Sequence, residues 1–158
     1  MRSIERRIVS AFIVSSDGKV LLGKKDPEKG GVYLDAWHSP GGGVDVEETD
    51  EQALIREVLE ETGIDISRME LVRVDDRGVG EATRKLPSGE KILIRMQFNI
   101  YKVILNKSST KVELIPRGDL VGLAWFPIES LEHLRLTPPA IELLAREGID
   151  WLTGAYNK

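Results

Sequence analysis

Three glutamates in the segment "REVLEETG", residues 56–63, have the types and spacing of a cation site. In a helix, where successive residues turn by roughly 100°, Glu57, Glu60 and Glu61 project within one quadrant of the surface. Glu57 and Glu61 are four residues apart, a spacing at which like charges destabilise a helix. The simpler interpretation is a solvated helix face on which Arg56 pairs with Glu60. The clustering of acids favours a site that holds a metal ion.

A glycine-rich segment, "SPGGG" at residues 39–43, precedes the acidic helix. Successive glycines let the backbone come close to a ligand. Carboxylates suit hard divalent cations such as Mg²⁺ and Mn²⁺, which bind phosphate oxygens at the same time. Such ions neutralise phosphoryl charge and lower the pKa of a bound water. Together the two segments predict chemistry on a chain of phosphates.

Residues 42–64 read "GGVDVEETDEQALIREVLEETGI". The pattern is Gly42, five residues, Glu48, seven residues, then Arg56-Glu57-aliphatic, one residue, Glu60-Glu61, one residue and Gly63-aliphatic. This pattern resembles the Nudix box, the signature of hydrolases that cleave nucleoside diphosphates linked to another moiety. The resemblance implies a fold of the α/β (α+β) class, an α/β/α sandwich with a mixed β-sheet. It also implies Mg²⁺ or Mn²⁺ as cofactor.

The resemblance also implies roles for residues of the box. Glu57 and Glu61 are expected to be metal ligands, and Glu60 a further ligand or the base that orients water. The Gly41 carbonyl, just before the box, resembles another ligand. Arg56 is expected to pair with Glu48 and so fix the glycine loop on the helix.

Other site residues are expected outside the acidic helix. One more acid often comes from the segment before a late strand, and Asp119 is the first choice and Glu113 the second. Four residues are expected to contact the substrate. These are Gly42, Gly43, Lys24 and Tyr33. Tyr33 and Phe98 could stack on a base. Lys24 and Lys25 close a strand and could contact phosphates, but a solvated strand end is the favoured interpretation for both. His38 is expected at the surface of a strand end.

Composition limits the remaining classes. The chain has 158 residues, 41% of them hydrophobic and 30% charged, as expected for one domain spanning 1–158. A net charge of −4 gives no reason to expect binding of extended nucleic acid or membranes. No segment reaches transmembrane length, so a cytoplasmic location is expected. The absence of cysteine excludes disulfides and thiol chemistry. A homodimer is left open.

The elements that must position the site follow from periodicity and turn residues. A hairpin is expected from strands at 7–15 and 19–24, and "SPGGG" is expected to break regular structure. Thr49 and Gln52 form a capping box, so the acidic helix should start near Asp50 and end at Gly63. Its apolar face is expected to be Ile55, Val58, Leu59 and Thr62. Further elements are expected as a strand at 71–74, a hairpin turning at 87–89, a strand within 120–128, and helices at 129–134 and 137–148.

The leading expectation is a pyrophosphohydrolase acting on nucleoside or deoxynucleoside triphosphates and releasing monophosphate and pyrophosphate. Nucleotide sugars, ADP-ribose and dinucleoside polyphosphates are alternatives. A different class is a non-catalytic Nudix domain that senses a nucleotide. Such domains usually lose box acids, and this chain keeps them all. An isomerase of isoprenoid diphosphates would require a cysteine, which the chain lacks.

Overall fold

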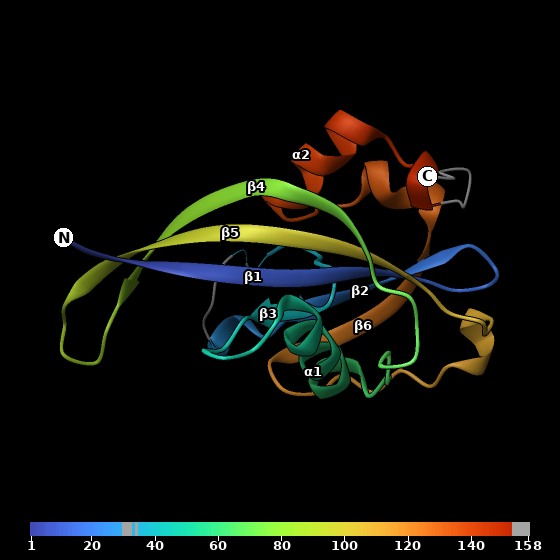
Figure 1. Cartoon of the computed structure of the whole chain (residues 1–158), viewed down its shortest axis with the longest axis horizontal. Coiled ribbons are helices and arrows are strands. Elements are labelled where there is room, and N and C mark those ends of the chain that lie inside the picture. Colours follow the sequence, from blue (N-terminus) through green and yellow to red (C-terminus); the bar gives the residue numbers. More distant parts are fainter. Residues whose placement is uncertain (30–32, 34, 153–158) are drawn as a thin grey trace.

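One mixed β-sheet with helices on both faces forms the core of the protein (Figure 1). The computed structural model describes residues 1–29, 33 and 35–152. The strand order is β4-β5-β1-β2-β6, and β3 pairs with β1 beside this path. The strands are β1 Arg2–Val14, β2 Lys19–Lys25, β3 Gly41–Gly43, β4 Val72–Lys85, β5 Lys91–Ile104 and β6 Leu120–Pro127. This arrangement confirms the predicted α/β/α sandwich.

Strand β1 organises the sheet because it runs through its centre. It pairs with β5 in parallel along its whole length, from Arg2 beside Ile92 to Val14 beside Ile104, while all other pairs are antiparallel. Side chains of a strand alternate between faces. Val9 and Ile13 therefore belong to the core under α1, whereas Phe12 belongs to the core under α2.

Helix α1, Asp50–Thr62, carries the acids and starts and ends where the sequence predicts. The Thr49 side chain accepts from the Gln52 amide and the Gln52 side chain accepts from the Thr49 amide. Gly63 ends the helix with φ of 77° and ψ of 4°, the left-handed region that glycine adopts at no cost.

The buried face of α1 differs from the predicted one. Ala53, Leu54, Val58 and Thr62 are buried, whereas Leu59 is 44% exposed. Ala53 and Leu54 join the contact with the sheet, Ile55 packs against it only partly buried, and Leu59 lies largely outside it, so the helix is rotated relative to the expected stripe. The rotation carries Glu61 toward the interior, where only 8% of it is exposed.

Polar contacts fix the N-terminal end of α1 on the sheet. The Asp50 carboxylate, on the first residue of the helix, accepts hydrogen bonds from Arg7 on β1 and, at 2.9 Å, from the Asn99 amide on β5. The Tyr101 hydroxyl on β5 donates to Glu51 at 3.2 Å. These bonds hold α1 at a defined height along β1, beside β3.

Two predictions of strand position were wrong. Residues 41–43 do not break regular structure, because they form β3 and pair with Ile8, Val9 and Ser10. A Cβ atom at Gly41 would lie 1.9 Å from the Val9 carbonyl oxygen, so this close pairing requires glycine. Strand β1 begins at Arg2, before the predicted start at Arg7, and β4 joins the strand predicted at 71–74 with the first arm of the hairpin predicted around 87–89. Their added residues are mostly charged and exposed, and hydrophobic alternation therefore does not mark them.

The second face of the sheet is covered by α2, Pro138–Glu147, and by short 3-10 helices (Figure 1). The helix predicted at 129–134 is a 3-10 helix at Ile128–His133. The 3-10 helix Asp150–Leu152 packs on the same face, and two further 3-10 helices, Pro27–Lys29 and Ser109–Lys111, lie outside this cluster. In the described part of the chain, no helix is both long enough and apolar enough to cross a membrane.

Candidate active site

The glycine strand β3 separates two sets of side chains. A Cβ atom at Gly42 would lie 2.5 Å from Cδ of Glu57, and one at Gly43 would lie 2.2 Å from a guanidinium nitrogen of Arg6. Successive residues of a strand point to opposite faces. The acids of α1 therefore lie against one face of β3 and Arg6 lies against the other. Any side chain larger than hydrogen at either glycine would displace these groups.

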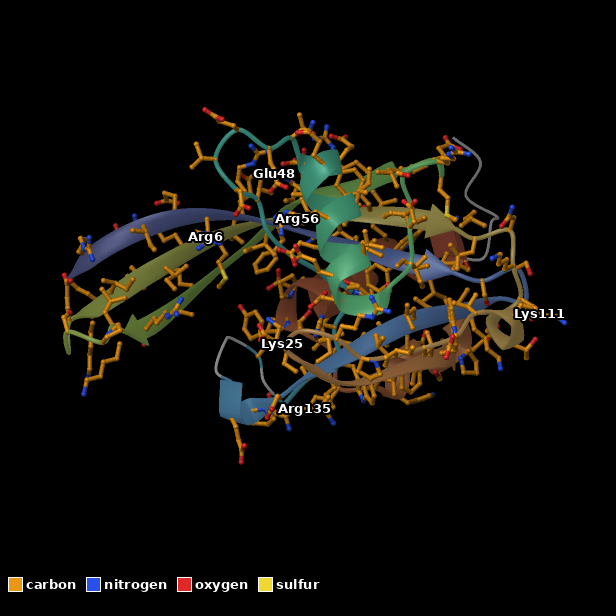
Figure 2. All side chains as sticks on the ribbon, turned by 90° about the horizontal axis from the view of Figure 1, so that it is seen from below. Arg6, Lys25, Glu48, Arg56, Lys111 and Arg135 are labelled. Atoms are coloured by element: carbon orange, nitrogen blue, oxygen red, sulfur yellow. The ribbon has the colours of Figure 1, made fainter. Side chains whose placement is uncertain are left out.

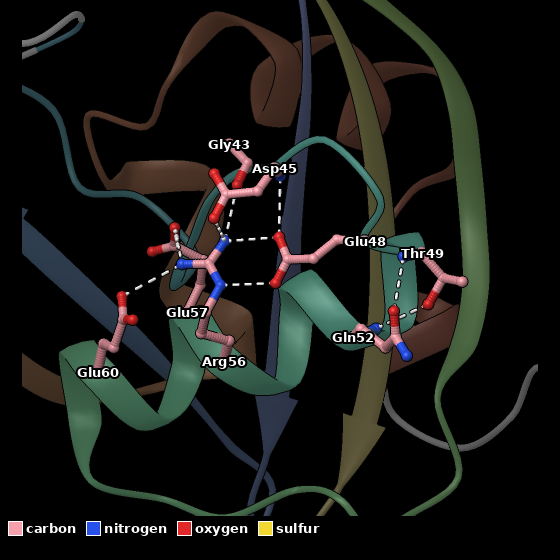
Figure 3. A network of polar contacts seen from close by, with 8 residues as sticks. All are labelled: Gly43, Asp45, Glu48, Thr49, Gln52, Arg56, Glu57 and Glu60. Carbon is pink, nitrogen blue, oxygen red and sulfur yellow. Dashed lines mark hydrogen bonds and ion pairs between the residues drawn. The ribbon is translucent and has the colours of Figure 1, made fainter.

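Arg56 lies at the centre of a network of acids (Figure 3). Its Nε donates to Glu48 Oε2 at 2.7 Å and its Nη2 donates to Glu48 Oε1 at 2.8 Å. Nη2 also donates to the Gly43 carbonyl at 3.1 Å. The expected pairing of Arg56 with Glu48 is thus present, and it ties the glycine strand to α1.

The same guanidinium contacts two glutamates of the trio. Nη1 donates to Glu57 at 2.9 Å and to Glu60 at 3.4 Å (Figure 3). The bonds from Arg56 lower the pKa of Glu48 to about 2. The pKa of Glu57 is instead raised, because burial outweighs the bond from Arg56 and the charge of Glu60 adds to the burial.

Glu61 is the most buried acid of the trio. Its Oε1 accepts a hydrogen bond of 2.9 Å from the Gly41 amide. Burial is the main cause that raises the pKa of Glu61 to about 7, and the negative charges of Glu57 and Asp119 raise it further. The positive charge of Lys25 acts in the opposite direction. The buried Glu61 and the half-buried Glu57 are neighbours, and the pKa of each is raised. Their negative charges are therefore not balanced by nearby positive charges.

The carboxylates predicted to bind the metal do not point to one common position in this structure. Among the described residues, no group of three or more acidic or histidine side chains is arranged to hold a metal ion. The reason is visible in the contacts, since Arg56 binds Glu57 and Glu60 while the Gly41 amide binds Glu61. It is the amide of Gly41, not the predicted carbonyl, that has a contact here.

The donor chemistry nevertheless fits a divalent cation. Glu57 and Glu61 supply hard oxygen donors, and a cation between them would compensate the charge that burial leaves uncompensated. Glu60 differs, because 58% of its side chain is exposed. Arg56 bonds to Oε1 of Glu57, which leaves the second carboxylate oxygen, Oε2, as the donor for a cation.

The two acids considered outside the helix lie in different places. Asp119 is exposed, its carbonyl accepts from the Asp26 amide, and its charge acts on Glu61. Glu113 instead lines a groove with Gly63, Lys107 and Arg117, at the C-terminal end of α1. The structure therefore associates Asp119, and not Glu113, with the acidic cluster.

A cavity of about 170 Å³ opens on the face of β3 opposite the acids. Gly41, Gly42 and Gly43 form one side, and Tyr33 and Phe98 are among the lining residues, as expected for stacking on a base. Lys24 is not among them, because its Nζ lies 5.1 Å from the ring centre of Trp37. Lys25, the next residue, lines the cavity instead. Figure 2 labels Lys25, the last residue of β2.

His38 also lines the cavity, and the prediction that it lies at the surface was wrong. Only 9% of it is exposed. Its backbone pairs with Gly23 of β2, which draws the residue into the sheet. Sequence reasoning missed His38 and Arg6 as site residues, and for Lys25 it favoured a solvated strand end. The one signal that could have found His38 is its position immediately before "SPGGG".

Two curated relatives are similar to parts of this chain. A segment of 63 residues is 40% identical to an RNA pyrophosphohydrolase of Gluconacetobacter diazotrophicus, covering 38% of each chain. A segment of 87 residues is 41% identical to an RNA pyrophosphohydrolase of Hydrogenovibrio crunogenus, covering 55% of this chain and 46% of the relative. The aligned segments thus span less than half the length of these two relatives.

Solved structures show the same fold. The dihydroneopterin triphosphate pyrophosphohydrolase of E. coli superposes with a TM-score of 0.63 and 19% identity, covering 92% of both chains. The family model described as the NUDIX domain matches residues 5–146. Because this match includes both the sheet and the complete acidic box, the chain belongs to the Nudix hydrolase family.

Proposed function

We propose that the protein is a divalent-metal-dependent pyrophosphohydrolase that acts on the 5′-triphosphate of a nucleotide and releases pyrophosphate. The observation that carries the proposal is the position of Glu57 and Glu61. Both carboxylates lie against the glycine strand, which also forms one side of the cavity. Because β3 consists of three glycines, the phosphates of a nucleotide whose nucleoside occupies the cavity would have to extend past this short strand to reach the acids on its other face.

In this proposal, Glu57 and Glu61 hold a Mg²⁺ or Mn²⁺ ion, with Asp119 as a further acid beside Glu61. When bound, such an ion neutralises phosphate charge and polarises the bond that breaks. Members of the family generally use divalent ions, which agrees with this donor set.

Glu60 has a different role in the proposal. Its side chain is 58% exposed, so it can contact the water that attacks phosphorus. Glu60 accepts a proton from this water as the new oxygen–phosphorus bond forms and the bridging oxygen–phosphorus bond breaks. The electron pair of the broken bond leaves with pyrophosphate. Arg56 positions these acids through its bonds to Glu48 and the Gly43 carbonyl.

Cations on the cavity side of β3 suit the rest of the triphosphate. Lys25 lines the cavity, and Arg6 lies against Gly43 (Figure 2). Both can bind phosphate oxygens without competing with the ion for the acids. Nucleotide sugars, ADP-ribose and dinucleoside polyphosphates contain the same diphosphate group and are the alternatives within this class.

A second candidate substrate is the 5′-triphosphate end of an RNA. The names of the relatives favour it, and so does the charge of the projecting ends of β1, β4 and β5. Basic residues outnumber acidic ones there, with Arg2, Arg6, Arg7, Arg84, Lys85, Lys91 and Arg95 against Glu5, Glu81 and Glu90. Such a surface suits a polyanion despite the negative net charge of the chain.

A turnover screen tests these proposals. Purified protein is incubated with Mg²⁺ or Mn²⁺ and with nucleoside triphosphates, nucleotide sugars, ADP-ribose, dinucleoside polyphosphates or a short RNA bearing a 5′-triphosphate. We expect pyrophosphate from the free triphosphates. Faster release from the RNA would favour the second candidate. No turnover of any class by folded protein would contradict both and favour a domain that only binds nucleotides.

A further inference from the structure

Strands β1, β4 and β5 continue beyond both helices as a three-stranded arm, made by residues 2–6, 80–85 and 91–96 (Figure 1). Residues in register on neighbouring strands point to the same face of a sheet, and the next residue of each strand points to the other face. One face of the arm therefore carries Arg6, Met96 and Gly80 in one row and Arg2, Ile92 and Arg84 in another. This surface is the arginine face of the arm.

The arginine face adjoins the cavity of the candidate active site. Met96 lines this cavity, and the guanidinium of Arg6 lies against Gly43 of β3. A nucleic acid whose 5′ nucleotide occupies the cavity continues from the 3′ oxygen of that nucleotide. The arginine face provides a surface next to the cavity on which the rest of the chain can lie.

The three arginines of this face are exposed and have few acidic partners. Within the described part of the chain, Arg6 and Arg84 form no ion pair. Arg2 lies 3.2 Å from Glu90 of the hairpin turn, and the two side chains are 57% and 47% exposed. An ion pair so exposed to solvent contributes little to stability, and Arg2 can exchange it for another anion.

The remaining acids of the arm lie on its opposite face. Glu5 and Glu81 are in register with Arg95, and their carboxylates lie 3.8 and 3.7 Å from its guanidinium. Charge in this row is therefore balanced, whereas the arginine face has an excess of positive charge, although the net charge of the chain is −4. This separation of charge indicates a surface for an anion.

The spacing of the arginines identifies the kind of anion. Arg6 and Arg2 are four residues apart on β1, roughly 13 Å at about 3.3 Å per residue. One free phosphate cannot contact both, whereas a chain of phosphates can, because a stacked nucleic-acid strand advances about 3.4 Å per nucleotide. The distance thus corresponds to about four nucleotides. Guanidinium groups bind phosphate oxygens through paired hydrogen bonds.

We propose that the arginine face of the arm binds the backbone of a single-stranded RNA whose 5′-triphosphate end occupies the active site. The inference rests on the proposed function and deepens it, because it makes the RNA end a better substrate than the free nucleotide. RNA is the source of the polyanion because transcripts begin with a 5′-triphosphate. The row between the two arginine rows, Ile4, Ile94 and Ala82, offers no ring for base stacking, so little dependence on RNA sequence is expected.

Turnover as a function of RNA length tests the proposal. With Mg²⁺ or Mn²⁺, KM should fall by about tenfold from the free nucleoside triphosphate to a 5′-triphosphate RNA of about four nucleotides, and then stay level. The double variant Arg2→Gln/Arg84→Gln should raise KM for an eight-nucleotide RNA by about tenfold and leave kcat/KM for the free triphosphate unchanged. Equal KM values for the free triphosphate and the RNA in the wild type would overturn the proposal.

A matched control removes the same number of charges from the opposite face. Lys85 and Lys91 are in register, one residue along from Arg84 and Ile92, so both point away from the arginine face. Lys85→Gln/Lys91→Gln should leave KM for the RNA within about threefold of wild type, because salt screens charges that do not contact the RNA. Equal rises in both double variants would overturn the assignment to the arginine face.

Binding without turnover separates this inference from the proposed function. With a chelator present, a labelled eight-nucleotide RNA with a 5′-hydroxyl should bind the wild type, and its affinity should fall as salt is added. In Arg2→Gln/Arg84→Gln the slope of log K against log salt should be shallower by roughly 1.4, since each phosphate contact of a single strand contributes about 0.7. If the slopes differ in this way but no substrate is hydrolysed, the proposed function fails and the role of the arm stands. If free triphosphates are hydrolysed and the slopes are equal, the role of the arm is wrong and the proposed function stands.

Discussion

Arg56 binds Glu48 through two parallel hydrogen bonds, from Nε to Oε2 at 2.7 Å and from Nη2 to Oε1 at 2.8 Å. The geometry of the guanidinium fork, which lysine lacks, makes this pairing possible. With the bond from Arg56 to the Gly43 carbonyl, it connects the acidic helix to the glycine strand. The position of the acids relative to β3 therefore depends on one side chain.

Arg56→Ala should lower the free energy of unfolding by about 1–3 kcal/mol, because the Gly43 carbonyl and the half-buried Glu57 lose their donor. Arg56→Lys should lose nearly as much, since a single ammonium cannot replace the fork. Urea unfolding measures both. Arg95→Ala is the control, because Arg95 is 53% exposed and its ion pairs are 3.7 Å or longer. Equal losses in the Arg56 and Arg95 variants would show that the network does not stabilise the fold.

Glu61 should make the metal-free protein less stable as pH rises. The folded state holds the proton up to a pKa of about 7, whereas the ordinary pKa of a glutamate in an unfolded chain is 4.5. The folded state thus binds more protons between these values, and stability decreases with rising pH in this window. Glu61→Gln does not titrate. With a chelator present, the free energy of unfolding of Glu61→Gln minus that of wild type should rise by about 2–3 kcal/mol from pH 5 to pH 8.

Without metal at pH 8, Glu61→Gln should be the more stable protein. Addition of Mg²⁺ or Mn²⁺ at the same pH should make the wild type more stable than the variant. An ion that binds the folded state raises the melting temperature of the wild type by mass action, and Glu61→Gln should gain less. The alternative, a solvated face of salt bridges, predicts no metal effect and a loss of stability when Glu61 is neutralised. That outcome in thermal melts would remove the support for a metal site.

The sequence pattern of the box predicts much of this site because it specifies local structure. Thr49, Gln52 and Gly63 determine where α1 begins and ends. Arg56 lies on this helix, and Glu48 lies in the loop just before it, eight residues earlier in the sequence. Burial of Glu61 and His38 could not be predicted in this way. It depends on the rotation of α1 against β1 and on the pairing of His38 with Gly23, and both are set by contacts between distant segments.

Glu47 is a non-glycine residue in a backbone conformation that favours glycine. Its φ is 75°, in the left-handed region. It follows Val46 in a turn closed by the bond from the Glu48 amide to the Asp45 carbonyl. Glycine is favoured at such a position of a type II turn, and a side chain there costs about 1–2 kcal/mol.

Glu47→Gly should therefore raise the free energy of unfolding by up to about 1 kcal/mol, after the larger entropy of glycine in the unfolded chain is subtracted. Glu70→Gly, at an exposed position without a positive φ, is the control and should lower it. Denaturant unfolding compares the two. A loss of similar size in both variants would show that the turn at Glu47 is not strained.

His38 should make the protein less stable at low pH. Its pKa is about 4 in the folded state because the ring is buried, against a model value of 6.5. Between these pH values the unfolded chain binds a proton that the folded state does not bind. The free energy of unfolding therefore decreases as pH falls. From pH 7 to pH 5 this amounts to about 2 kcal/mol. His38→Gln should lack this part of the pH dependence, whereas His133→Gln, at an exposed position, should keep it. Parallel pH dependence in all three proteins would contradict the burial of His38.

The central claim is that the acids of α1, placed against the glycine strand, carry out phosphate hydrolysis. The most direct measurement is kcat for the best nucleotide at saturating metal in Glu57→Gln, Glu60→Gln, Glu61→Gln and the control Glu51→Gln. Glu51 lies in the first turn of the same helix and contacts Tyr101 instead of the cluster. We predict that kcat falls by at least roughly a hundredfold in the three cluster variants and stays within about threefold of wild type in Glu51→Gln. Near-normal kcat in all three cluster variants would contradict the account.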